Sequence, residues 1–262
     1  MSDNWNTYIC NVNHKLASIF VDIGIRSNVP DQGRPWLLWV WVYFKKPRPD
    51  GLSSRKEFEV LISLEDKLVA SMEQTCKAVL SGRITTDGRR EFYFYGPQPE
   101  GFDPAVRASL GLFHGYNFDS GIRQDEGWTQ YLNVLYPSEE QFQLIGNRDL
   151  LDSLRRRGDN LEKARNVCHW AYFNDRADRE VFREAGLALG YRIVSENENP
   201  VRDRHYGICL ERMQDMAPEK IDEAVMELFR ASQSAHGEYD GWECQVITDA
   251  KSKRERSWWK LW

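Results

Sequence analysis

The chain has 262 residues, 41% of them hydrophobic and 29% charged, which is enough for two ordinary domains and excludes a disordered chain. The N-terminal stretch is polar and no apolar run approaches the roughly 20 residues that span a bilayer, so we expect a cytoplasmic protein without a membrane segment. The net charge of −5 is uneven: residues 138–250 carry 15 Lys/Arg and 23 Asp/Glu, which favours a basic partner over naked nucleic acid.

The first half of the chain reads as strands, a helix and more strands. Residues 6–12 and 16–25 predict an opening hairpin, and the run "WLLWVWVYF" at 36–44 is apolar on both faces, which is typical of a central strand. A helix is expected after Ser53 or Ser54, with Glu57 at capping-box spacing from Ser54. Its predicted buried face consists of Phe58, Leu61, Ile62, Leu68, Val69 and Met72.

A hairpin and a short helix follow in the first half. Asp87-Gly88 is a favoured two-residue turn between strands, because both positions need positive φ. Asp103 is the expected cap of a short helix that has Pro104 in its first turn. The stretches "YNFDSGI" and "WTQYLNVLY" (128–136) are then predicted to be strands.

The second half begins with a helix at 138–157, for which Gly146-Asn147 suggests a break. Periodicity then predicts, in order, strand 166–173, helix 176–189, strands 190–196 and 206–212, helix 218–234 and strand 241–247. The fold class is therefore α+β, with two domains of the split βαβ, ferredoxin-like type, each a mostly antiparallel sheet with helices on one face. The expected boundaries are 1–136, 138–248 and a basic, Trp-rich tail at 249–262.

A short echo connects the two halves. "WVYF" (41–44) ends a strand before a loop and a helix, and "WAYF" (170–173) does the same. Each is followed by a helix, two strands, a helix and a strand. The sequence leaves open whether this is a true repeat or the common demand of a central strand.

The chemical candidates give no active site. Cys168 and His169 are neighbours in a strand, so their side chains point to opposite faces and cannot form a dyad. Cys244 shares the core face with Trp242 and Val246, so Glu243 points away from it and cannot be its base. We therefore expect no enzyme, no catalytic residues and no cofactor.

The segment "SAHGEYDGWECQV" (234–246) gathers several groups that could bind a metal. His236, Glu238 and Asp240 fit no metal-ligand spacing, so no metal site is predicted. Gly237 is instead the expected left-handed cap of the preceding helix, and Asp240-Gly241 an expected turn into the last strand.

Two surfaces are candidates for binding. Acidic side chains of the last helix and the segment after it form the predicted protein-binding surface: Glu219, Asp222, Glu223, Glu227, Glu238, Asp240 and Glu243. Aromatic residues of the central strands, such as Tyr93, Tyr95, Trp170 and Tyr172, leave open an RNA-binding alternative through base stacking. The tail "KSKRERSWWKLW" can dock on the acidic domain, lie at a membrane surface or contact a partner, and we favour docking or partner contact.

Two resemblances stand beside this interpretation. The stretches "LRRRGD", "HWAYF", "GYRI" and above all "GEYDGWECQV", within about residues 138–247, resemble the RraB family of ribonuclease E regulators. The stretches "WLLWVWVYFKKPRPDGLSS" and "GRITTDGRREFYFYG", within about residues 5–135, resemble the bacterial domain of unknown function 695.

The first resemblance implies a non-catalytic protein that binds ribonuclease E and restrains RNA decay. The acidic balance of residues 138–250 fits a basic, disordered partner segment of that kind. The expected partner is thus a protein, ribonuclease E or another basic segment, with RNA only as the alternative and no membrane. The sequence leaves the formation of a homo-oligomer open.

Overall fold

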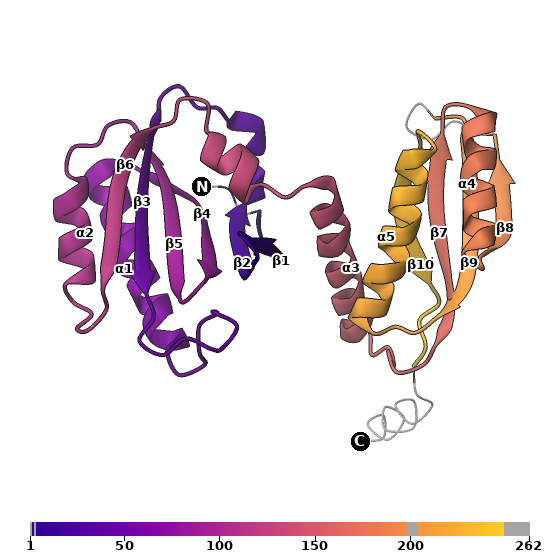
Figure 1. Cartoon of the computed structure of the whole chain (residues 1–262), viewed down its shortest axis with the longest axis horizontal. Helices are drawn as coiled ribbons and strands as arrows, with labels where there is room; N and C mark the ends of the chain where they lie inside the picture. The colour runs from indigo at the N-terminus through magenta and orange to yellow at the C-terminus, as the bar shows by residue number, and fades with distance from the viewer. Residues whose placement is uncertain (1, 3, 199–203, 249–262) are drawn as a thin grey trace, which may run out of the picture. The chain divides into compact units, whose positions relative to one another are not determined.

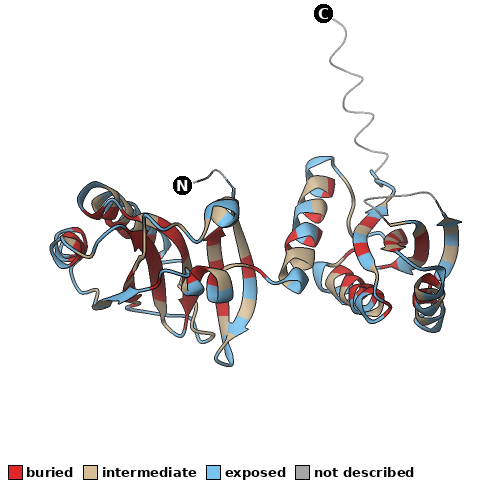
Figure 2. Ribbon diagram, turned by 90° about the horizontal axis from the view of Figure 1, so that it is seen from above, coloured by how far each residue is buried: buried red, intermediate tan, exposed pale blue. Residues whose placement is uncertain are grey.

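The computed structural model describes residues 2, 4–198 and 204–248. The chain divides into two compact units, Met1–Ser138 and Glu139–Trp262, and each consists of one antiparallel sheet with helices (Figure 1). The predicted α+β class is confirmed in both. Figure 2 shows buried residues along the strands of both units and on one side of the helices. The expected tail at 249–262 lies outside the described residues.

The first unit has a six-stranded sheet in the order β1-β2-β4-β5-β3-β6. Its helices α1 and α2 lie together on one face of this sheet (Figure 1). The predicted hairpin strands and the Asp87-Gly88 turn are confirmed, and both turn residues have positive φ. The elements are β1 (Trp5–Val12), β2 (Lys15–Asp22), η1 (Ile23–Asn28), β3 (Trp36–Tyr43), α1 (Phe58–Cys76), β4 (Val79–Thr86), β5 (Arg89–Gly96), α2 (Phe102–Leu110), β6 (Phe118–Gln124) and η2 (Tyr131–Leu135).

The helix side of the first sheet forms its main core. Leu38, Val40 and Val42 of β3 alternate toward the helices and are fully buried against residues such as Leu64 and Leu68 of α1. The predicted helix face was partly wrong, because Phe58 and Ile62 are exposed at 53% and 41%. The residues of α1 that are buried are Leu61, Leu64, Leu68, Met72 and Cys76.

Both predicted helix caps in the first unit were wrong. Glu57 does not complete a capping box with Ser54, because its carboxylate accepts hydrogen bonds from the backbone N–H groups of Lys45 and Lys46. Asp103 lies inside α2, whose N-cap is Gly101 in the left-handed conformation. In both places a contact distant in sequence or a glycine turn replaced the local pattern.

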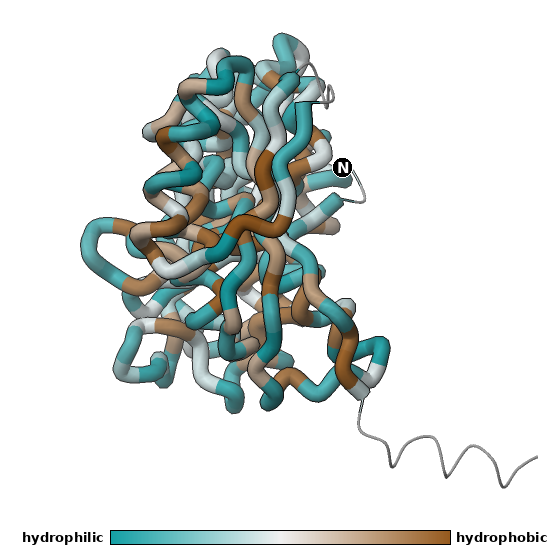
Figure 3. Tube along the Cα trace, turned by 90° about the vertical axis from the view of Figure 1, so that its right-hand side faces the viewer, coloured by the Kyte–Doolittle hydropathy of each residue, from teal (hydrophilic) through white to brown (hydrophobic). Residues whose placement is uncertain are grey.

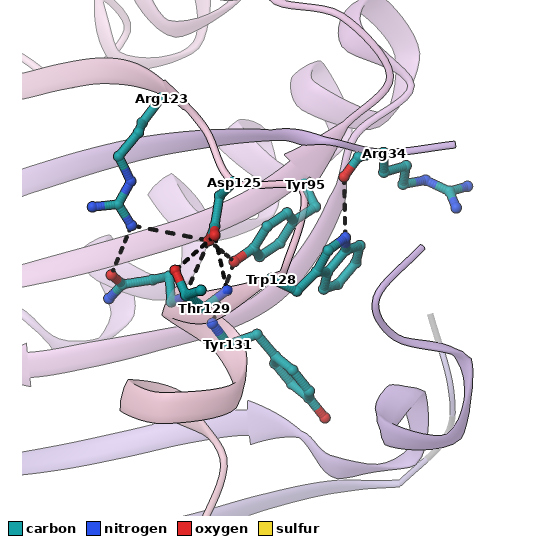
Figure 4. A network of polar contacts seen from close by, with 8 residues as sticks. Arg34, Tyr95, Arg123, Asp125, Trp128, Thr129 and Tyr131 are labelled. Carbon is teal, nitrogen blue, oxygen red and sulfur yellow. Dashed lines mark hydrogen bonds and ion pairs between the residues drawn. The ribbon is translucent and has the colours of Figure 1, made fainter. Parts of the chain in front are cut away.

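The stretch 128–136, predicted to be a strand, is instead helical over residues 129–135, which include the π-helical turn η2. Asp125 explains this, since its carboxylate accepts hydrogen bonds from the backbone N–H groups of Thr129 (2.9 Å) and Gln130 (3.0 Å) and so caps a helical start (Figure 4). The Tyr95 hydroxyl donates to the same carboxylate at 2.6 Å. We call residues 125–136 the cover segment, because it packs on the face of the sheet opposite α1 and α2.

Aromatic rings fasten the cover segment to the sheet. Trp128 stacks on Tyr95 with ring centroids 3.8 Å apart, and its indole N–H donates to the carbonyl of Arg34 (Figure 4). Tyr131 packs edge-on against Trp128, and its hydroxyl donates to the carbonyl of Asp22. Trp128 is 2% exposed and Tyr131 is fully buried, so this side of the first sheet also has a core.

The second unit has a four-stranded sheet in the order β10-β7-β9-β8. Helices α4 and α5 pack on one face of it, and α3 packs against α5. The predicted elements are all present, although the expected break at Gly146-Asn147 is wrong because α3 is continuous. The elements are α3 (Glu139–Arg156), β7 (Arg165–Phe173), α4 (Arg176–Ala188), β8 (Arg192–Asn197), β9 (Tyr206–Gln214), α5 (Pro218–Ser234) and β10 (Glu238–Cys244).

The two units share one topology. Each unit contains a β-α-β-β-α-β series, with strands β3, β4, β5 and β6 in the first unit and β7, β8, β9 and β10 in the second. In both sheets the four strands of the series lie side by side in the order fourth, first, third, second, which is β6-β3-β5-β4 and β10-β7-β9-β8. Trp41 and Trp170 occupy the same place in it, because the strand neighbours Val42 and Ala171 both point to the buried helix side. The echo between "WVYF" and "WAYF" therefore coincides with a shared fold.

The segment 234–246 departs from its predicted turns. His236, not Gly237, has the left-handed φ of 54° after α5. The pair Asp240-Gly241 lies inside β10, where the register shifts between Tyr239 and Gly241 in a β-bulge. Trp242 and Cys244 pack against the core as predicted, but Val246 lies beyond the end of β10 and is 37% exposed.

Candidate protein-binding surface

The seven predicted acidic residues lie in two groups. Four of them are on α5, whose apolar side packs on the sheet through Ile221, Val225 and Leu228. The other three are on β10, where Glu238 and Glu243 stand opposite Tyr172 and Cys168 and share their face of the sheet. That face is the one away from the helices. The structure therefore does not gather the seven carboxylates into one patch.

The acidic row on α5 follows from its helical spacing. Glu219, Glu223 and Glu227 are four residues apart, so they lie on one side of the helix, and all three are exposed. Together with neighbouring side chains they line a shallow hollow of about 510 Å³. The lining residues are Glu219, Asp222, Glu223, Met226, Glu227 and Arg230.

Two of these carboxylates already have a basic neighbour. Glu223 lies 2.8 Å from the Lys220 ammonium, and Glu227 lies 3.4 Å from the Arg212 guanidinium. The Lys220–Glu223 pair is largely exposed to solvent, where an ion pair contributes only about 0–1 kcal/mol, whereas Arg212 is half-buried. A basic partner could therefore replace Lys220 at little cost, whereas Arg212 is also held by the Leu189 carbonyl and the Tyr191 ring.

Asp222 differs from the rest of the row because it is engaged inside the unit. The Asn147 side-chain amide donates to its carboxylate at 2.8 Å. Burial raises the pKa of Asp222, and the hydrogen bond from Asn147 and the charge of Arg148 partly oppose this. Asp222 is thus a structural contact between α3 and α5.

Asn147 itself was missed by the sequence prediction. It is 3% exposed, and its carbonyl oxygen accepts a hydrogen bond of 2.8 Å from the Trp242 indole while its amide donates to Asp222. One side chain thereby joins α3, α5 and β10. The available signal was a polar residue in the middle of a helical stretch, which we interpreted as a break.

The β10 group is also engaged in local contacts. Glu238 forms an ion pair of 3.0 Å with Arg204, and Glu243 accepts a hydrogen bond of 3.1 Å from the Trp170 indole N–H. Asp240 is exposed at the bulge. Glu238 and Glu243 thus lie beside Tyr172 and Trp170, and the β10 group is separate from the α5 row.

The cysteine and histidine candidates have structural roles. His169 is fully buried on the helix side, where its ring nitrogens contact the Tyr239 hydroxyl at 2.7 Å and the Gln214 carbonyl oxygen at 2.9 Å. Cys168 points to the other face, as predicted, and contacts Glu211. Burial raises the pKa of both Cys168 and Cys244, which makes these thiols poor nucleophiles.

Neither a metal centre nor a membrane helix emerges from the described residues. Within 2, 4–198 and 204–248, the His, Cys, Asp and Glu side chains form no group of three or more that could hold a metal ion. In the same ranges no helix combines the length and the apolar character needed to cross a bilayer. Figure 3 shows how hydrophobic and hydrophilic residues alternate along the chain.

The structure corrects the aromatic surface proposed for the first unit. Tyr93 and Tyr95 are 6% and 0% exposed, and the Tyr93 hydroxyl donates to Glu91 within the sheet. They cannot stack on bases. In the second unit, by contrast, Trp170 and Tyr172 are half-buried on the face of the sheet away from the helices.

The fold and surfaces define a two-domain α+β protein whose second unit exposes an acidic row on α5 and carries half-buried aromatic residues on its sheet. The chain belongs to the family of unknown function DUF695, whose family model matches residues 3–136. Residues 144–244 match the family model for "Regulator of ribonuclease activity B". Both resemblances stated from the sequence are confirmed, and the second match indicates a regulator of ribonuclease activity.

Comparison with known proteins adds little beyond these families. No curated protein gives a significant match. Among solved structures, a crystal structure of an unknown protein from Galdieria sulphuraria is 9% identical, with 82% of this chain and 99% of that chain covered. Its TM-score is 0.22, which is too low to support an argument about fold or function.

Proposed function

We propose that the second unit is a non-catalytic module that binds a ribonuclease, with ribonuclease E as the first candidate, and restrains it through the acidic row of α5. The observation that carries this proposal is the match of residues 144–244 to regulators of ribonuclease activity. The row supplies a surface for a basic, disordered segment of the enzyme. The protein acts in the cytoplasm and needs no cofactor.

Three carboxylates of the row are the proposed contacts. Glu219, Glu223 and Glu227 are exposed and regularly spaced, so an extended or helical basic segment could meet all three. Asp222 is left out of the contact set because it bonds to Asn147. Electrostatic contacts of this kind speed association and weaken as salt rises.

The test is binding of the full chain to ribonuclease E, measured by calorimetry at low and high salt. The variant Glu219→Lys/Glu223→Lys/Glu227→Lys should bind at least tenfold more weakly, because repulsion replaces three attractions. The same variant should no longer slow RNA cleavage by the enzyme. The full chain alone should leave the RNA intact.

A matched control carries the same change of charge on the other unit. Glu59, Asp66 and Glu73 lie on α1, and replacing all three with Lys should leave ribonuclease binding unchanged. Equal weakening by both triple variants would show that only net charge matters and would overturn the assigned surface. Cleavage of RNA by the full chain alone would overturn the non-catalytic role.

An RNA-binding function is the second candidate, supported by the half-buried Trp170 and Tyr172 on the sheet face away from the helices. Glu238 and Glu243 beside them disfavour phosphate. Trp170→Ala should lower RNA affinity at least threefold if this function is correct. Unchanged affinity in a folded variant would remove it.

A further inference from the structure

The edge strand β6 of the first sheet directs part of its backbone outward. β6 ends the order β1-β2-β4-β5-β3-β6, so β3 pairs with one side of it and no strand of the described chain pairs with the other (Figure 1). At its two ends, the Tyr43 N–H donates to the Asn117 carbonyl and the Asp125 N–H donates to the Pro35 carbonyl. Because hydrogen-bonded pairs alternate along an antiparallel ladder, the odd-numbered residues of β6 bond to β3. The even-numbered residues therefore direct their N–H and C=O groups away from the sheet.

This edge lacks the features that usually prevent further strand pairing. Proline, lysine or a β-bulge commonly protects an edge strand. β6 has seven residues, "FDSGIRQ", with neither proline nor lysine, and its pairing with β3 has no shift in register. The edge strands of the second sheet differ, since β8 and β10 each contain a shift in register. The backbone of β6 is therefore regular enough to accept another strand.

The charges of β6 are complementary to those of a second β6. Asp119 and Arg123 lie on either side of Gly121, on the sheet face away from the helices, and both are exposed. When two copies of β6 pair antiparallel about Gly121, Asp119 of each copy stands directly opposite Arg123 of the other. These are non-hydrogen-bonded pairs, in which opposite side chains lie closest. The opposite edge strand, β1, has no charged residue and so offers no such match.

The match selects one register. An axis at Ser120 would set Asp119 opposite Gly121, and an axis at Ile122 would set Asp119 opposite Asp125. Both alternatives lose the attraction, and the second replaces it with repulsion. The axis at Gly121 also pairs β6 over its whole length, with Ser120 opposite Ile122 in a hydrogen-bonded pair.

Both charged groups are available to a second copy. The Tyr43 hydroxyl donates to one carboxylate oxygen of Asp119 at 2.6 Å, which leaves the other oxygen for Arg123 of the second copy. The Arg123 guanidinium is 56% exposed, and its contacts within the unit are long, 3.9 Å to Asp125 and 3.5 Å to Gln130. A carboxylate from another copy could therefore bind it more closely than these neighbours do.

Apolar side chains at the same edge favour this pairing as well. A Cβ atom on Gly121 would lie 2.4 Å from the Trp39 ring, so the ring lies directly over the strand. Trp39 is half-buried, and Ile122 on the helix side is 41% exposed. Pairing about Gly121 brings the two Trp39 rings together near the axis and covers Ile122, so it removes apolar surface from water on both faces.

We propose that β6 pairs antiparallel with β6 of a second copy of this chain, about a two-fold axis at Gly121, with Asp119 of each copy bound to Arg123 of the other. The contact is isologous and joins two first units in one continuous sheet. It does not depend on the proposed binding of a ribonuclease, which uses the acidic row of α5 in the second unit.

The test is sedimentation of the full chain over a range of concentrations, with exchanged charges. Asp119→Arg sets two basic groups against each other in both pairs of the dimer, and Arg123→Asp sets two acidic groups against each other. Each variant alone should dimerise at least tenfold more weakly than the unchanged chain. An equimolar mixture of the two should form mixed dimers at about the original affinity, because every pair in them is again of opposite charge. Both positions are exposed, so circular dichroism should show an unchanged fold.

A second variant tests the backbone contact and keeps the charges. Ser120→Pro removes an outward N–H without touching the bonds to β3, and should also weaken the dimer at least tenfold. Arg107→Asp reverses an exposed charge on α2 and is the matched control, which should leave the dimer unchanged. A chain that stays monomeric up to about 0.3 mM would overturn the proposal. A dimer that survives Asp119→Arg and Arg123→Asp, a mixture that fails to restore it, or equal weakening by Arg107→Asp would overturn it too.

Discussion

The two units have the same strand order but differ on the sheet face that lies away from the helices. In both, apolar residues alternate toward a pair of helices, as Val42 does in β3 and Ala171 in β7. The first unit then adds a hairpin and the cover segment, so that Tyr95 and Trp128 form a second core. The second unit leaves Trp170 and Met213 at least partly exposed. One topology can therefore carry either a second core or a partly exposed face.

Removing one tryptophan from each unit gives the largest expected contrast. Trp128→Ala deletes a ring that is 2% exposed and should lower the free energy of unfolding of the first unit by about 4 kcal/mol. Trp170→Ala removes a half-buried ring and one hydrogen bond to an exposed carboxylate, and should cost the second unit about 1 kcal/mol. Native-state hydrogen exchange reports on each unit separately. Similar losses in the two units would contradict the difference between a covered and a partly exposed face.

The second unit should show its own dependence on pH through His169. Burial lowers the pKa of His169 to about 4, and the hydrogen bond to Gln214 only partly opposes this shift. The unfolded chain therefore binds a proton more readily than the folded one between pH 6.5 and about 4. As pH falls through this range, the second unit should lose up to about 3 kcal/mol of stability.

Amide exchange in β7 and β9, measured between pH 7 and 4, checks this prediction. The variant His169→Gln should flatten the loss, because its amide cannot gain a proton. His205→Gln changes an exposed histidine of the same unit and is the matched control. A loss of stability in β7 that is unaffected by His169→Gln would assign the dependence to another group.

Asp125 should give the smallest of the three effects, and in the first unit. Burial alone would raise its pKa, but hydrogen bonds from Tyr95, Thr129 and Gln130 outweigh burial and lower it. Asp125→Asn weakens these bonds and should lower the stability of the first unit by about 2 kcal/mol at pH 7.

The pH range, rather than the sign, distinguishes Asp125 from His169, because both contributions to stability are lost as pH falls but that of Asp125 is lost only below about pH 4. Because the pKa of Asp125 is lowered on folding, its contribution is present above the ordinary carboxyl pKa of about 4 and is lost as pH falls through the folded value. Asp119→Asn is the control, since that carboxylate also accepts from a tyrosine, Tyr43, but is exposed. Urea unfolding measures both variants. Equal destabilisation by Asp125→Asn and Asp119→Asn would show that Asp125 does not stabilise the cover segment through its buried hydrogen bonds.

Local patterns predicted the second unit well and the first unit less well. Apolar residues alternate along 166–173 and line one face of α5, and these residues are buried against one core. The hydrophobic period of the sequence was therefore sufficient to predict both elements. The stretch 128–136 failed because its helical turn depends on Asp125, whose carboxylate meets the N–H groups of Thr129 and Gln130. Its aromatic residues have strand propensity, and tertiary contacts overrode that propensity.

The candidate binding surface could be predicted only in part from the sequence. Helical spacing placed Glu219, Glu223 and Glu227 together, and this row is present. The division between α5 and β10 was missed, because which face Glu238 and Glu243 occupy depends on the pairing of β10 with β7. The same holds for Asn147, whose role requires both Trp242 and Asp222 as neighbours.

The shared strand order has a consequence for how the chain folds. Two adjacent units with one topology can exchange equivalent strands during folding, which is a known failure of multidomain and repeat proteins. The short echo between "WVYF" and "WAYF" is identical at three of four positions. The two strands begin differently, because β7 starts with Arg165, which is buried in bonds to Asp159 and the carbonyl of Asn160, whereas β3 starts with Trp36. A strand placed in the wrong sheet would leave that guanidinium without its partners. The different starts of β3 and β7 therefore disfavour the exchange of these two strands.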